Sequence, residues 1–250
     1  MPHETGATQD VGDMKPISML SPNHEPRPAG IAIDTLILHY TGMKTAQAAL
    51  ARMCDPEAKV SAHYLIDEDG AVFLLVPEAM RAWHAGVSSW RGETNINDRS
   101  IGIELVNPGH EFGYRKFPEK QMAALIALLR EILSRHPIPQ SRVLGHSDVA
   151  PGRKTDPGEL FEWHRLAESG IGLWPESKPM KSLPVNLPVS EIQSMLWAYG
   201  YLVPRSGVLD GETKDALIAF QRHFRPERID GAIDGETFAR LSWLLEHSGS

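Results

Sequence analysis

The chain lacks several features that mark broad classes of protein. Cys54 is the only cysteine among 250 residues, so no disulfide can form within the chain and cysteine pairing does not indicate a compartment. Cys54 lies on the apolar stripe of a short helix that Thr45 is expected to cap, so we expect a buried, unreactive thiol. No apolar run is long enough to cross a membrane, and we expect no transmembrane segment.

Positive charge is also scarce. The net charge is −7, and no basic patch is dense enough to indicate a nucleic-acid partner. The first thirty residues show no positively charged start followed by an apolar stretch, so no secretory signal is seen. We therefore expect a cytoplasmic protein, with the periplasm as the alternative, and a neutral or zwitterionic small molecule or polymer as its partner.

What is present is a medium domain followed by a small one. Hydrophobic residues make up 42% of the chain, which is ordinary for a soluble globular protein with a sizeable core. Composition and periodicity divide the chain into a polar N-terminal segment, a main domain, a proline-rich linker and a helical C-terminal domain: residues 1–29, 30–175, 176–188 and 189–250.

Hydrophobic periodicity predicts the elements of the main domain. An apolar stripe predicts a long helix over residues 118–135, and the turn at 67–70 predicts a hairpin. Short β-rich runs predict five strands, near residues 34–39, 62–67, 71–76, 101–106 and 142–145.

Three residues have the chemistry of a metal site. His39 ends the apolar strand, and His146 and Asp156 lie in a segment rich in turn residues that can fold back on itself. Two neutral imidazoles and one carboxylate leave one position of a tetrahedral zinc ion open for water, as in catalytic sites. We therefore predict one Zn²⁺ per chain, bound by these three side chains.

Two further residues complete a candidate hydrolytic site. Alternation in the strand at 101–106 places Glu104 on the face opposite Ile103. A carboxylate there needs a partner, and an activated water would give Glu104 the roles of general base and then general acid. Lys154, two residues before Asp156, is placed to face a developing oxyanion.

Each of these residues also has a structural interpretation. A single histidine such as His39 is more often a core or surface residue than a ligand, and Glu104 alone can belong to a buried ion pair. Asp148 competes with Asp156 as the carboxylate ligand, although its spacing from His146 is expected to point it away. The motif His-Glu-x-x-His is absent, which excludes the simple metalloprotease pattern.

Five segments of the main domain resemble, in the same order, the zinc-dependent N-acetylmuramoyl-L-alanine amidases of the AmpD/AmiD branch. The resemblance runs from about residue 30 to 175. It is carried by the segments Leu38-His39-Tyr40-Thr41, Ser61-Ala-His63-Tyr-Leu-Ile66, Arg81-Ala-Trp83-His84-Ala-Gly86, Asn97-Asp-Arg-Ser-Ile-Gly-Ile-Glu104 and Gly145-His-Ser-Asp-Val-Ala-Pro-Gly-Arg-Lys-Thr-Asp-Pro-Gly158.

The resemblance implies an α/β fold with a mixed central β-sheet flanked by helices, and hydrolysis of the amide between muramic acid and L-alanine in peptidoglycan or muropeptides. It implies Zn²⁺ bound by the three predicted ligands, with Glu104 and Lys154 as the catalytic pair. Other residues of these motifs are expected to support the metal ligands or contact substrate, with Trp83 either stacking on a sugar or lying in the core. They are His63, His84, Trp83 and Tyr40.

Residues 189–247 resemble the small helical peptidoglycan-binding domain that is often fused to cell-wall hydrolases. Helical spacing predicts three helices, and the tetrapeptide Asp-Gly-Glu-Thr occurs at 210–213 and 234–237 as a repeated helix start. A calcium loop is the competing interpretation, but the alternating oxygen ligands are missing. The domain is expected either to bind peptidoglycan or to serve only as a packing appendage.

Two other functions compete with the amidase. A peptidoglycan recognition protein of the same fold would bind without cutting, but a lost metal ligand marks such proteins and all three positions are filled here. An endopeptidase or a lysozyme-like glycosidase is less favoured, and a glycosidase would need two carboxylates facing a sugar, for which the sequence offers no pair. We therefore expect an enzyme of cell-wall recycling or remodelling.

Overall fold

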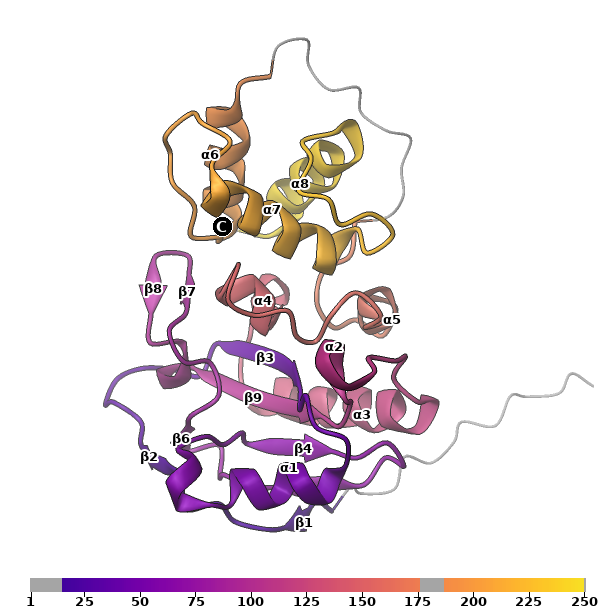
Figure 1. The fold of residues 1–250 in the computed structure, drawn as a ribbon. Helices are drawn as coiled ribbons and strands as arrows, with labels where there is room; N and C mark the ends of the chain where they lie inside the picture. The colour runs from indigo at the N-terminus through magenta and orange to yellow at the C-terminus, as the bar shows by residue number, and fades with distance from the viewer. Residues whose placement is uncertain (1–14, 176–186, 250) are drawn as a thin grey trace, which may run out of the picture.

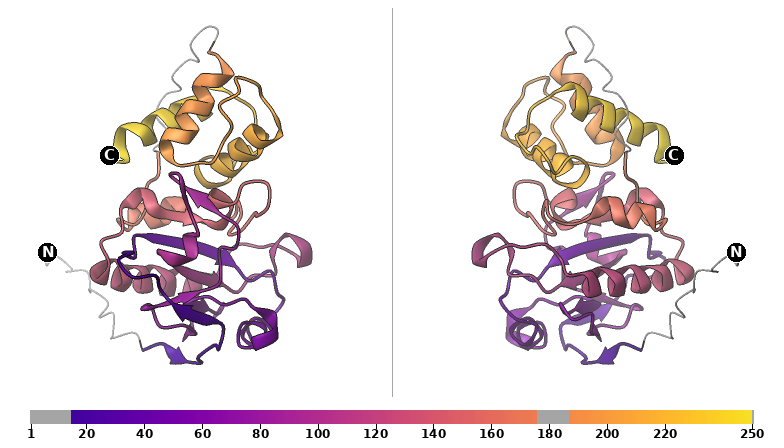
Figure 2. Two further views of the ribbon diagram at one scale, coloured as in Figure 1. Left: turned by 90° about the vertical axis from the view of Figure 1, so that its left-hand side faces the viewer. Right: turned by 90° about the vertical axis from the view of Figure 1, so that its right-hand side faces the viewer.

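The computed structural model describes residues 15–175 and 187–249. A mixed β-sheet with helices on both faces forms the larger domain, and the C-terminal helices lie at one end of it, above α4 and α5 (Figure 1). Side views show the two domains stacked along one direction (Figure 2). Within the described ranges, no helix is long and apolar enough to cross a membrane.

The main sheet has six strands in the order β1-β5-β4-β9-β3-β10, and two small two-stranded sheets pair β2 with β6 and β7 with β8. Only β4 and β5 run antiparallel within the main sheet. The strands are β1 (Ile17–Ser18), β2 (His24–Pro26), β3 (Thr35–Tyr40), β4 (Tyr64–Ile66), β5 (Val72–Leu74), β6 (Met80–Ala82), β7 (Ser89–Trp90), β8 (Glu93–Thr94), β9 (Ser100–Leu105) and β10 (Val143–Gly145).

Eight α-helices and three short 3₁₀ helices join these strands in the part of the chain that the structure describes. The α-helices are α1 (Ala46–Met53), α2 (Gly109–Phe112), α3 (Glu119–Arg135), α4 (His146–Val149), α5 (Trp163–Glu168), α6 (Val189–Tyr199), α7 (Gly211–Phe224) and α8 (Gly235–His247). The 3₁₀ helices are η1 (Pro56–Ala58), η2 (Ile96–Asp98) and η3 (Gln140–Arg142).

The two faces of the sheet carry different residues because side chains alternate along each strand. Leu36, Leu38 and Ile103 face the side covered by α3 and join its apolar stripe in the largest core cluster. Ile37 faces the other side, where it joins a second cluster that includes α4 and the C-terminal helices. His39 and Glu104 therefore share the face that α3 does not cover.

The C-terminal domain is packed onto the larger domain. One core cluster runs through both, and in it the ring of Trp90 lies edge-on to Tyr201 with ring centroids 5.0 Å apart. Asp210 and Asp234 cap α7 and α8 by accepting hydrogen bonds from the backbone N–H groups of Thr213 and Thr237. The repeated tetrapeptide thus begins two helices, as predicted.

The predicted long elements are confirmed. The five predicted strands appear as β3, β4, β5, β9 and β10, the predicted hairpin joins β4 to β5, and the predicted long helix is α3. Thr45 caps α1 by accepting the N–H of Ala48. The mixed sheet flanked by helices and the three C-terminal helices agree with the expected fold class.

Three expectations turn out differently or lie outside the described residues. Residues 15–29 are not merely a polar segment, because β1 extends the main sheet beside β5 and β2 pairs with β6. Cys54 is partly exposed rather than buried, because it is the C-terminal cap of α1 and its Sγ lies against the carbonyl of Met19, at 3.8 Å. Most of the expected linker, residues 176–186, lies outside the described residues.

Candidate active site

The three predicted metal ligands meet on the face of the sheet that α3 leaves open. His39 stands on β3, His146 begins α4 directly after β10, and Asp156 lies in the loop that follows α4. The Nδ1 atoms of the two histidines are 3.0 Å apart, and Asp156 Oδ2 is 2.9 Å from one and 3.1 Å from the other. All three side chains are buried.

A relay of hydrogen bonds behind His39 assigns its tautomer. The Ser100 hydroxyl donates to the carbonyl of Ile96 at 2.7 Å, so its oxygen accepts the Nε2–H of His84 at 3.1 Å. His84 Nδ1 then accepts the Nε2–H of His39 at 3.0 Å. The Nδ1 of His39 is left with a lone pair that points at Asp156 and His146.

The tautomer of His146 follows from one contact. Its Nε2 lies 2.9 Å from the carbonyl oxygen of Ala85, which can only accept, so Nε2 carries the proton. The Nδ1 of His146 therefore also presents a lone pair to the cluster. Arg153 donates to the same carbonyl at 2.7 Å and holds it in place.

Three electron-rich atoms thus converge without a proton between them. Burial, followed by the neighbouring His146, lowers the pKa of His39 to about 4, so its ring is neutral near pH 7. Burial opposes ionisation of Asp156, but His146 and His39 outweigh it and hold the pKa of Asp156 well below its usual range. Two imidazole lone pairs and a carboxylate repel one another unless a cation lies between them. The donor set therefore fits a metal ion.

Glu104 stands beside the cluster. In the parallel pairing of β3 with β9, Glu104 lies directly opposite His39, so both side chains leave the same face on adjacent strands. Glu104 Oε2 is inaccessible to solvent and has no hydrogen-bond partner among the residues that the structure describes. Burial, and then the charge of Asp156, raises the pKa of Glu104 to about 8. Such a group can take up and return a proton near neutral pH.

Lys154 lies close enough for its charge to affect the pKa values of Glu104 and His39. Its ammonium lowers the pKa of Glu104 against the stronger effect of burial, and it also contributes to the low pKa of His39. Its backbone N–H donates to Ala150 at the end of α4. The residue is partly exposed.

His84 and His63 lie behind the metal-facing atoms. His84 contacts His39 directly, and its ring fills the space over Gly102, where a Cβ would lie only 2.4 Å from a ring carbon. His63 lies one layer further back, with its Nδ1 accepting the N–H of Gly102 at 3.0 Å and its ring 5.8 Å from that of His84. Of the two alternatives predicted for these histidines, the geometry favours support of the ligands over contact with substrate.

Tyr40 and Trp83 lie in different surroundings. The Tyr40 hydroxyl contacts Thr155 Oγ1 at 2.9 Å, which ties β3 to the residue between Lys154 and Asp156. The indole N–H of Trp83 donates to Glu25 on β2, while the following residue, His84, contacts His39. Trp83 is partly exposed, so it lies neither in the core nor beside the three ligand atoms.

Several supporting residues did not follow from the sequence. Ser100 supports the site through its hydroxyl, whereas His146 and Arg153 both meet the main-chain carbonyl of Ala85, which has no sequence signature. Gly102 offered the best signal, because a glycine inside a strand often marks the close approach of another group.

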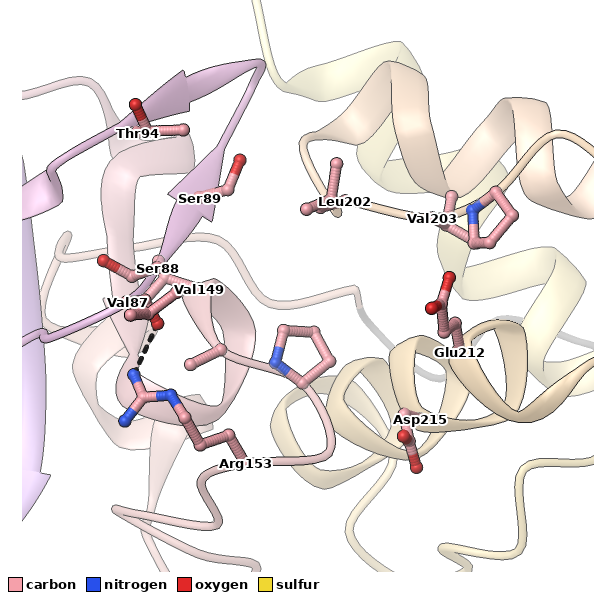
Figure 3. A pocket seen from close by; sticks show the side chains of 13 residues that line it. Val87, Ser88, Ser89, Thr94, Val149, Arg153, Leu202, Val203, Glu212 and Asp215 are labelled. Carbon is pink, nitrogen blue, oxygen red and sulfur yellow. Dashed lines mark hydrogen bonds between the residues drawn. The ribbon is translucent and has the colours of Figure 1, made fainter.

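A groove of about 580 Å³ runs between the two domains, close to this supporting layer. Val87, Ser89 and Thr94 line it from the larger domain, while Leu202, Glu212 and Asp215 face them from the C-terminal domain (Figure 3). Arg153, whose guanidinium donates to the carbonyl of Val87, forms its inner wall. The groove borders the end of α4 and the loop that leads from it to Asp156, but it is not lined by the three ligands themselves.

Comparison with protein families and known proteins agrees with this site. The family model for N-acetylmuramoyl-L-alanine amidase matches residues 29–159, and a model for a peptidoglycan binding domain matches residues 186–241. The N-acetylmuramoyl-L-alanine amidase AmiD of Escherichia coli is 38% identical over 237 residues, which cover 87% of this chain and 84% of the relative.

Solved structures show the same architecture. AmpDh3 from Pseudomonas aeruginosa in complex with an anhydromuramic pentapeptide has a TM-score of 0.79 at 37% identity, covering 89% of this chain and 95% of that one. Escherichia coli AmiD in complex with the substrate anhydro-N-acetylmuramic acid-L-Ala-D-gamma-Glu-L-Lys has a TM-score of 0.77 at 36% identity, covering 88% and 92%. The match of both domains and the converging ligands show that this chain belongs to the N-acetylmuramoyl-L-alanine amidase family.

Proposed function

We propose that this amidase cleaves the bond between the lactyl carbonyl of anhydro-N-acetylmuramic acid and L-alanine in soluble muropeptides, with one Zn²⁺ held by His39, His146 and Asp156. The observation that carries the proposal is the convergence of three unprotonated ligand atoms, 2.9 to 3.1 Å apart, beside a buried carboxylate. Anhydromuropeptides bound to two relatives of similar fold support this substrate class.

Zinc suits the donor set because it accepts imidazole nitrogen and carboxylate oxygen in tetrahedral sites. When bound, it would act as a Lewis acid that polarises the scissile carbonyl and acidifies a water molecule. His84 and Ala85 hold the two imidazole rings from behind, so both Nδ1 atoms are oriented before any ion binds.

Glu104 is assigned the proton transfers. Its Oε2 has no partner in the described part of the chain and is free to accept a proton from the attacking water. As the carbon–nitrogen bond breaks, the same carboxyl returns that proton to the departing amino group of L-alanine. The overall reaction consumes one water and yields the lactyl carboxylate and the free peptide.

We assign to Lys154 the stabilisation of the negative charge that develops on the carbonyl oxygen during attack. Its ammonium acts electrostatically on both Glu104 and His39, so it lies within range of a substrate held between them. A positive charge fixed beside the developing oxyanion stabilises the transition state more than the neutral ground state.

Muropeptide fragments and intact polymer are the two forms in which this bond occurs. The anhydro sugars in the related complexes support soluble fragments and a role in cell-wall recycling. The peptidoglycan-binding family match over residues 186–241 supports polymer as a second substrate. We rank soluble fragments first.

The proposal is tested by mass analysis of products from anhydromuropeptides and from whole sacculi. The native protein is expected to release free stem peptide and peptide-free sugar, faster from the fragments. Glu104→Gln keeps the shape of the side chain but not its basicity, so turnover should fall by about a hundredfold to ten-thousandfold while zinc content is unchanged.

Two results would contradict the proposal. Cleavage between sugars with the peptide still attached would indicate a glycosidase. A Glu104→Gln variant that releases peptide at the native rate would show that another group moves the proton.

A further inference from the structure

A second buried carboxylate lies two residues after His146 and takes no part in the metal cluster. Asp148 on α4 is fully buried and accepts three hydrogen bonds. The backbone N–H of Gly145 donates to Oδ2 at 2.8 Å, His223 Nδ1 donates to Oδ2 at 2.7 Å, and the Tyr201 hydroxyl donates to Oδ1 at 2.6 Å. Two of these three donors belong to the C-terminal domain.

Both of these donors are held by ring packing. His223, on α7, is sandwiched between Trp163 and Phe224, with ring centroids 3.7 and 3.8 Å away. Tyr201 lies edge-on to Trp90 at 5.0 Å. α7 lies directly above α4 (Figure 1). These ring contacts hold the two donors against Asp148, and a buried carboxylate depends on such donors because it has lost its water.

Asp148 connects this contact to the metal ligands. Its side chain caps α4 at Gly145, and the first residue of that helix is His146. The next residue, Ser147, donates its backbone N–H to the carbonyl of Asp156 at 3.0 Å. The position of α4 therefore determines where His146 lies, because His146 is part of the helix. It also determines where Asp156 lies, through this hydrogen bond.

We propose that Tyr201 and His223 are positioning residues of the amidase: by holding Asp148, the C-terminal domain fixes α4 and thereby two of the three metal ligands. The inference rests on the proposed function, since it assumes that these ligands bind zinc. It gives the C-terminal domain a part in the chemistry that is separate from any binding of peptidoglycan.

The test removes the two hydrogen bonds and keeps the rings. In the full-length chain, Tyr201→Phe/His223→Phe preserves the stacking while leaving Asp148 only the N–H of Gly145. Zinc affinity, measured by competition with a chelator, is expected to weaken by about tenfold, as for other residues that orient metal ligands. With zinc saturating, kcat on an anhydromuropeptide should fall while KM stays within about twofold, because substrate contacts are untouched.

A matched control separates positioning from general weakening of the domain contact. Arg91 Nε donates to the carbonyl of Tyr199 at 3.1 Å across the same interface and does not contact Asp148. Arg91→Met should lower the melting temperature without changing zinc affinity. His223→Asn, which places an amide N–H near the position of Nδ1, should recover part of the affinity lost in His223→Phe.

The inference is overturned if the double variant binds zinc and turns over like the native chain, with only the thermal loss seen in Arg91→Met. If the double variant does not fold, the two single variants are judged by the same criterion. A native chain that fails to bind zinc or to release peptide would instead refute the proposed function. The two failures are therefore distinguishable.

Discussion

At the scale of single residues, the site is organised by which nitrogen of each histidine carries a proton. The relay from Ile96 through Ser100 and His84 leaves His39 Nδ1 unprotonated. The carbonyl of Ala85 accepts the Nε2–H of His146, which leaves the Nδ1 of His146 unprotonated as well. The sequence was sufficient to nominate the ligands because their types and motifs are distinctive. It could not reveal the relay, because Ser100 meets His84 only through the folded arrangement of β9 and the loop after β6.

Ser100→Ala tests the relay directly. Without the hydroxyl, His84 loses the acceptor that fixes its Nε2–H, so its ring can change tautomer and no longer orients His39. Zinc affinity should weaken by about tenfold. Competition with a chelator measures the zinc affinity. The control is Ser141→Ala, which removes another buried hydroxyl away from the cluster. Equal zinc affinities in Ser100→Ala and Ser141→Ala would show that the relay does not orient His39 for metal binding.

At the scale of elements, strand register brings His39 and Glu104 side by side. Alternation in the sequence predicted that Glu104 lies opposite Ile103, but the pairing of β3 with β9 had to be seen in the structure. Two-residue strands such as β1 and β7 escaped prediction because alternation cannot be recognised over so short a run. Their existence depends on partners that lie far away in the chain.

A partly buried ion cluster around Glu78 makes a pH-dependent prediction. Burial alone would raise the pKa of Glu78, but hydrogen bonds from Arg135, His136 and Tyr64 outweigh it and lower the pKa to about 2 from its usual 4.5. A depressed carboxyl pKa contributes stability that is present above the unfolded-state pKa and is lost as pH falls through the folded-state value.

Glu78→Gln should therefore lower the free energy of unfolding by about 2 kcal/mol at pH 7. The difference from the native chain should shrink as pH falls from about 4.5 toward 2. Urea unfolding over this pH range measures it. Glu119→Gln, which removes an exposed partner of Arg165, should leave stability nearly unchanged at both pH values. A loss from Glu78→Gln that is equally large at pH 7 and pH 3 would rule out the ion cluster as its cause.

At the scale of the whole molecule, the two domains share a core and meet at α4, the helix that begins with His146. Composition and periodicity predicted a main domain and a helical C-terminal domain, because the helical repeat and the proline-rich stretch differ from the sheet region. Their mutual packing was not predictable, since Asp148, Tyr201 and His223 are distant in sequence and each has several ordinary interpretations.

The central claim is that one zinc ion, held by His39, His146 and Asp156, is required for cleavage of the muramoyl amide. The most direct measurement titrates zinc into metal-free protein while peptide release from an anhydromuropeptide is followed by mass analysis. The account predicts no release without metal and a rate that rises to its maximum at about one zinc per chain. Metal-free protein that releases peptide at the native rate would contradict it.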